Sequence, residues 1–77
     1  MKEKLEQYFK TDFHYFEEGL KNEDDIRRRN DMCWYARQRA LGAIGMAQLC
    51  GLDFATCEEM FDEYCKKLEE KVYGKMC

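Results

Sequence analysis

The sequence predicts an all-α fold: a three-helix bundle built on an antiparallel helical hairpin, as a single helical domain spanning residues 1–77. Three long amphipathic stretches are each followed by a glycine, namely Gly19, Gly51 and Gly74. A glycine just past a helix adopts the left-handed conformation without Cβ strain, so it is a common helix terminator. Proline is absent, which favours long uninterrupted helices.

The first helix is expected over residues 2–18. Its apolar side chains recur at spacings of three and four residues, which places them on one face: Leu5, Phe9, Phe13 (or Asp12 in its place) and Phe16. Thr11 and Asp12 are residue types that cap helices. The sequence therefore leaves open whether this helix is interrupted at that point.

The second helix is expected over residues 23–50, with Asn22 as its N-cap. Acidic residues at the start of this stretch would lie at the positive end of the helix dipole, which is favourable. The polar first half gives way to a second half rich in alanine and glycine. At 1.5 Å per residue the helix would be on the order of 40 Å long.

The third helix is expected over residues 54–73, with Asp53 as its N-cap and Gly74 as its terminator. Thr56 and Glu59 form a second capping pattern, so the start is uncertain by three residues. Only three residues connect the second and third helices, and a connection this short predicts an antiparallel hairpin.

Composition limits the function classes. A chain of 77 residues buries only about 60% of its unfolded surface, so its own core is marginal and self-association is expected. A net charge of −3 makes broad nucleic-acid binding less favoured. The charged N-terminus resembles no signal peptide and no apolar run approaches the ~20 residues of a membrane span, so we expect a cytoplasmic location.

Metal, cofactor and catalytic sites are not expected. The five cysteines lie far apart in sequence and do not form the short-spaced pairs typical of zinc sites, so we expect reduced thiols, mostly in the core. His14 is the single histidine, and nothing in the sequence brings it to a particular cysteine. The interior glycines do not follow a strand, so they do not form a phosphate-binding loop. We therefore expect a protein that is not an enzyme.

Small residues are concentrated in the second helix: Ala36, Ala40, Gly42, Ala43, Gly45 and Ala47. Each interior glycine costs roughly 1 kcal/mol relative to alanine in a helix. We therefore expect another backbone to approach this set closely. The sequence leaves open whether that backbone is another helix of the same chain or the same helix of a second subunit in a homodimer.

Arginines and a tryptophan form a candidate site for a small anionic ligand: Arg27, Arg28, Trp34, Arg37 and Arg39. An arginine beside an exposed aromatic ring can hold a nucleotide by phosphate pairing and ring stacking. The alternative is that these arginines pair with acidic residues of the chain while Trp34 packs in the core.

Acidic residues form a third candidate site, a partner surface at the start of the third helix: Asp53, Glu58, Glu59, Asp62 and Glu63. Such a surface could inhibit a nucleic-acid-binding protein, although the net charge makes this hypothesis rank last. The leading hypothesis is a small protein-interaction or regulatory module that acts as a homodimer, of the accessory type found in bacteria and phages. Binding of a nucleotide, another anion or nucleic acid ranks second.

Overall fold

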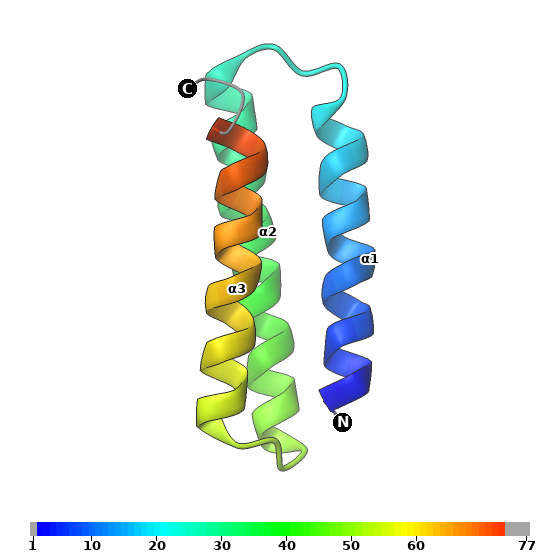
Figure 1. The fold of residues 1–77 in the computed structure, drawn as a ribbon, viewed down its shortest axis with the longest axis vertical. Coiled ribbons are helices and arrows are strands. Elements are labelled where there is room, and N and C mark those ends of the chain that lie inside the picture. The colour runs from blue at the N-terminus through cyan, green and yellow to red at the C-terminus, as the bar shows by residue number, and fades with distance from the viewer. Residues whose placement is uncertain (1, 74–77) are drawn as a thin grey trace.

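The chain folds into three helices that pack side by side in an all-α bundle, as predicted (Figure 1). The computed structural model describes residues 2–73, over which helices α1 (Lys2–Leu20), α2 (Ile26–Leu49) and α3 (Phe54–Tyr73) alternate in direction. As a result α1 and α3 run parallel, and each packs mainly against the antiparallel α2 between them. The expected terminator Gly74 and the last cysteine, Cys77, lie outside the described residues.

Helix α1 is continuous through Thr11 and Asp12. The Thr11 hydroxyl donates a hydrogen bond back to the Gln7 carbonyl within the same helix, at 3.0 Å, instead of capping a new one. The helix also continues past the predicted end at residue 18 to Leu20, which is buried in the core. Gly19 is therefore helical and does not terminate α1. Its lack of a side chain makes room for Met32, because a Cβ there would lie 2.5 Å from the Met32 Cε.

Helix α2 begins at Ile26, three residues later than predicted, because Asp25 and not Asn22 is the N-cap. The Asp25 carboxylate accepts a hydrogen bond from the backbone N–H of Arg27, at 2.9 Å, and so satisfies a donor that the helix leaves free. The connection before it is held by Arg29, whose guanidinium donates to the Glu23 carbonyl at 2.9 Å and to the Lys71 carbonyl at 3.0 Å. Arg29 thus ties the α1–α2 connection to the end of α3.

The turn between α2 and α3 matches the predicted hairpin. Gly51 has a φ of 103°, the left-handed conformation, and its N–H donates to the Gln48 carbonyl. The Leu52 N–H donates to the Ala47 carbonyl, which completes a Schellman motif and ends α2. Asp53 then caps α3, accepting from the Thr56 N–H at 3.0 Å and from the Thr56 hydroxyl at 2.7 Å. These two hydrogen bonds lower the pKa of the Asp53 carboxyl.

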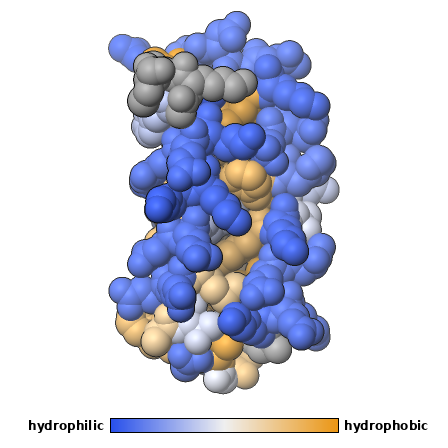
Figure 2. Space-filling view, in the orientation of Figure 1, coloured by the Kyte–Doolittle hydropathy of each residue, from blue (hydrophilic) through white to orange (hydrophobic). Residues whose placement is uncertain are grey.

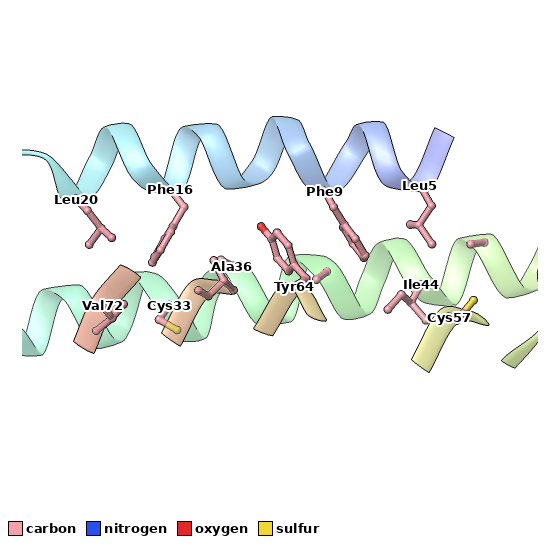
Figure 3. Packing of buried hydrophobic residues seen from close by; sticks show 13 residues of the cluster. Leu5, Phe9, Phe16, Leu20, Cys33, Ala36, Ile44, Cys57, Tyr64 and Val72 are labelled. Atoms are coloured by element: carbon pink, nitrogen blue, oxygen red, sulfur yellow. The ribbon is translucent and has the colours of Figure 1, made fainter. Parts of the chain in front are cut away.

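The core lies along the axis where the three helices meet (Figure 3). The aromatic and leucine side chains of α1 point toward α2 and α3, and small residues of α2 leave room for them. Phe9 stacks on Tyr64 of α3, with ring centroids 4.7 Å apart. The most deeply buried large side chains come from α3: Cys57, Leu68 and Val72. Burying a leucine or valine side chain contributes about 1.5–3 kcal/mol, and α1 adds Leu5, Phe9, Phe16 and Leu20 to the same core.

None of the helices within residues 2–73 combines the length and apolar character needed to cross a membrane.

Candidate protein-interaction surfaces

The buried side of α1 holds one acidic residue, and an arginine of the predicted anion site pairs with it. Asp12 is only 8% exposed, and one of its carboxylate oxygens accepts a hydrogen bond from the Arg39 guanidinium at 3.1 Å. A hydrogen bond with Tyr8 and the charge of Asp12 together raise the pKa of Arg39. Arg39 is therefore part of the contact between α1 and α2.

A buried hydroxyl lies beside this pair. Tyr64 reaches from α3 toward α1 between Phe9 and Phe16, and its hydroxyl has no hydrogen-bond partner (Figure 3). The second carboxylate oxygen of Asp12 also has none. Burial and the nearby Asp12 carboxylate raise the pKa of the Tyr64 phenol. Leaving a buried polar atom unpaired costs stability, so the core carries a polar defect at this point.

The other arginines of the predicted anion site are spread over different sides of α2. Arg37 pairs with Glu69 of α3, and Arg28 pairs with Glu23 of the preceding connection at 3.8 Å. Positions i and i+2 of a helix are about 200° apart around its axis, so the side chains of Arg37 and Arg39 point toward different neighbouring helices. Trp34 is 60% exposed, which excludes the expectation that it packs in the core. Its ring therefore faces solvent, whereas Arg37 and Arg39 turn away to pair with α3 and α1.

The set of small residues is divided between the inside and the outside of the bundle. Ala36, Ala40 and Ala47 are buried in the core, and Ala43 packs against it. Gly42 and Gly45 are exposed, and a Cβ built on either would meet, apart from its chain neighbours and the adjacent backbone of α2, no atom of the described residues within 4 Å. The two glycines therefore serve no close helix crossing within residues 2–73.

Around these glycines, the solvent-facing side of α2 carries no charge. We define the outer face of α2 by six exposed residues that recur on one side of the helix: Trp34, Gln38, Leu41, Gly42, Gly45 and Leu49. Leu49 is 84% exposed and Leu41 is 46% exposed, which is unusual exposure for leucine in two positions of one helix. Large apolar side chains grouped on a surface mark interaction sites.

A second apolar surface is the groove between α1 and α3, visible as an apolar strip between two hydrophilic rims (Figure 2). This α1/α3 groove has a volume of about 710 Å³ and is lined by Glu6, Phe9, Lys10, Phe13, Met60, Glu63, Tyr64, Lys67, Glu70 and Lys71. Phe13 and Met60 are half-buried on its floor. At one end Lys71 bridges the groove to Glu17 of α1, with 2.9 Å between the Nζ and carboxylate atoms.

Sequence reasoning did not identify this groove. The pattern of α1 places Phe9 and Phe13 on the packing face, but it does not show how closely α1 approaches α3. One available signal is the number of long helices. In a bundle of three, α2 packs against both α1 and α3, and the side of α1 and α3 that faces away from α2 is left uncovered by the described helices. The wide aromatic face of α1 is broader than its contact with α2 requires.

The five residues of the predicted acidic surface are all exposed. Asp53 holds the N-terminus of α3, and Glu63 lies on the rim of the α1/α3 groove. Glu58, Glu59 and Asp62 lie on the solvent-facing part of α3.

The cysteines of the described chain are free thiols. Cys33 and Cys57 are buried, Cys65 is half-buried with its pKa raised by burial, and Cys50 is exposed. No group of three or more histidine, cysteine, aspartate or glutamate residues within positions 2–73 is placed to hold a metal ion. Comparison of the chain with protein-family models, curated proteins and solved structures gives no significant match.

Proposed function

We propose that this chain is a small non-enzymatic protein-interaction module that self-associates as a homodimer through the outer face of α2. The observation that carries the proposal is the character of that face, which exposes Trp34, Leu41 and Leu49 without a charged residue among them. In a twofold dimer the same surface patch faces itself. An uncharged patch can do so without bringing like charges together.

The two glycines on the outer face of α2 support a helix–helix contact. Gly42 and Gly45 lower the helical stability of the isolated chain by roughly 1 kcal/mol each relative to alanine. Open space above both positions lets a second α2 approach the backbone closely. The surface from Trp34 to Leu49 extends over about 24 Å of helix, at 1.5 Å per residue. Stable interfaces bury about 800 Å² per partner, a moderate part of the 5726 Å² that the chain exposes.

The dimer is tested by native mass spectrometry under reducing conditions together with sedimentation at micromolar concentrations. We expect the wild-type chain to be a dimer and Leu41→Glu to be a monomer, because the substitution places two carboxylates against each other across the twofold axis. Gln7→Glu is the matched control: it adds the same charge on an exposed position of α1 and should leave the dimer intact.

A monomeric wild-type chain at all of these concentrations would contradict the proposal. So would equal effects of Leu41→Glu and Gln7→Glu. An added mass of nucleotide size would instead favour the arginine and tryptophan site. Circular dichroism of each variant verifies that the helices are retained.

A further inference from the structure

The α1/α3 groove has the dimensions and direction of a missing fourth helix. Its lining runs from Met60 to Lys71 on α3, about 17 Å or three helical turns. Helices α1 and α3 run parallel along its two sides, and α2 lies antiparallel beneath them. A helix placed in the groove antiparallel to both would complete an up-down four-helix bundle.

The charges on the rims change sign along the groove, and the stacked pair Phe9 and Tyr64 fixes their order. Glu6 and Glu63 precede this contact on their respective helices, and Lys10 and Lys67 follow it, four residues further on in each case. Four residues are about one helical turn. The groove therefore has an acidic pair and, one turn further along, a basic pair. Beyond the basic pair, α3 adds Glu70 and Lys71, whose charges are opposite, and Lys71 is paired with Glu17.

We propose that the α1/α3 groove binds an amphipathic helix of a partner protein, antiparallel to α1 and α3. Its apolar stripe packs on Phe13 and Met60, its acidic residues lie over Lys10 and Lys67, and its basic residues, one turn later, lie over the Glu6 and Glu63 end. The proposal rests on the chain being an interaction module, as inferred above, and adds the chemistry of the partner.

The direction of the partner helix follows from the rims. An antiparallel helix meets the basic pair first and the acidic pair one turn later. It therefore carries glutamate at position i and lysine or arginine at position i+4, the order that also stabilises an isolated helix best. Its basic residues then lie toward its C-terminus, where the helix dipole favours cations. A parallel helix would need the less favourable order.

The test uses two synthetic helical peptides of identical composition, each with a leucine stripe flanked by glutamate and lysine. In one peptide glutamate precedes lysine by four residues, and in the other the two are exchanged. We expect the first to bind wild-type protein roughly tenfold more tightly by fluorescence anisotropy. In the antiparallel direction the exchange turns four weak attractions into repulsions. In the parallel direction the exchanged peptide keeps the attractions, but its helix has the less stable order of charges and does not complete the up-down bundle. The preference should weaken as salt is added.

A variant with the rim charges reversed supplies the control. It carries Glu6→Lys, Lys10→Glu, Glu63→Lys and Lys67→Glu, all at exposed positions, and should prefer the other peptide. Leu41→Glu should keep the wild-type preference, because it alters only the outer face of α2. Equal binding of both peptides, or a preference that the reversed rims do not change, would overturn the proposal.

The same variants separate this proposal from the dimer. If reversing the rim charges dissolved the dimer while Leu41→Glu did not, the groove would hold a second copy of the chain, and the partner-helix proposal would be overturned. If the Leu41→Glu variant remained a dimer and kept the wild-type peptide preference, the proposal for the dimer face would fail and the proposal for the groove would stand.

Discussion

Asp12 shows how one residue can decide the role of another. Its carboxylate is buried on the face of α1 that meets α2, so it needs a cation, and Arg39 is the residue that supplies one. Arg39 is itself 53% exposed, so its charge remains partly hydrated while its hydrogen bond reaches inward. An arginine that looks from the sequence like part of a ligand site is thereby used to neutralise the core.

We expect Arg39→Leu to lower the free energy of unfolding by about 2–3 kcal/mol, because Asp12 would remain buried without its charged partner. Arg37→Leu is the matched variant: the carboxylate that it leaves, Glu69, is 51% exposed and can be hydrated, so the substitution should cost under about 1 kcal/mol. Urea unfolding monitored by circular dichroism measures both. Equal costs for the two variants would show that the Asp12–Arg39 pair does not contribute as a buried pair.

Tyr64→Phe is expected to raise the free energy of unfolding by about 1 kcal/mol, because it removes a buried hydroxyl that has no partner. The variant also changes how the free energy of unfolding depends on pH in alkaline solution. The pKa of Tyr64 is raised in the folded chain, whereas the phenol of the unfolded chain ionises at about pH 10. The unfolded state therefore loses its proton first, and wild-type stability falls as the pH rises above that value.

The alkaline loss should be smaller in Tyr64→Phe, as measured by urea unfolding at a series of alkaline pH values. The substitution keeps the aromatic ring on which Phe9 stacks, so the apolar packing should be retained. A loss of stability in Tyr64→Phe at neutral pH would mean that the hydroxyl has a hydrogen-bond partner in solution.

At the scale of the elements, the glycines of α2 and its turn have opposite roles. Gly42 has helical backbone and open space above it, so Gly42→Ala should stabilise the chain by about 1 kcal/mol through helix propensity. Gly51 also has open space, but its φ of 103° strains any other residue, so Gly51→Ala should destabilise by about 1 kcal/mol.

Both glycine variants are best measured in the Leu41→Glu background, so that self-association does not enter the unfolding free energy. Thermal unfolding gives the sign directly. A destabilising effect of Gly42→Ala in this background would show that a segment of the same chain contacts that position.

The elements were largely predictable from the sequence because their signals are local. The Gly51 turn and the Asp53 cap depend on neighbours within one helical turn. The end of α1 differs from the prediction because it depends on a tertiary contact, the burial of Leu20 in the core. The start of α2 differs because Asp25, and not Asn22, is the N-cap, although both are cap-forming residue types. The bond from Arg29 to the Lys71 carbonyl, which holds this connection to α3, is also absent from any local pattern.

The candidate surfaces were harder to predict for the same reason. The sequence groups Ala36 with Gly42 by size, but their positions around α2 differ and only the first is buried. Likewise it groups Arg37 and Arg39 by charge, although each pairs with a different helix. The α1/α3 groove depends on the distance between two helices that are far apart in the sequence, and no local pattern encodes that distance.

At the scale of the whole molecule, the two candidate surfaces lie on opposite sides of a bundle that measures 40 × 20 × 17 Å. The groove opens between α1 and α3, whereas the outer face belongs to α2, which packs beneath them. A contact through one surface therefore leaves the other unobstructed. Self-association and partner binding can occur in the same assembly without competing for residues.

This opposition gives the proposed dimer a valence of two. Two copies joined through α2 would hold their grooves facing away from each other, each able to take one helix. A partner carrying two such helices, or one that is itself dimeric, would meet the second groove at an effective concentration set by the linker between its helices and not by its bulk concentration. Weak single contacts would then add up to tight bridging, which a monomer with the same groove could not provide.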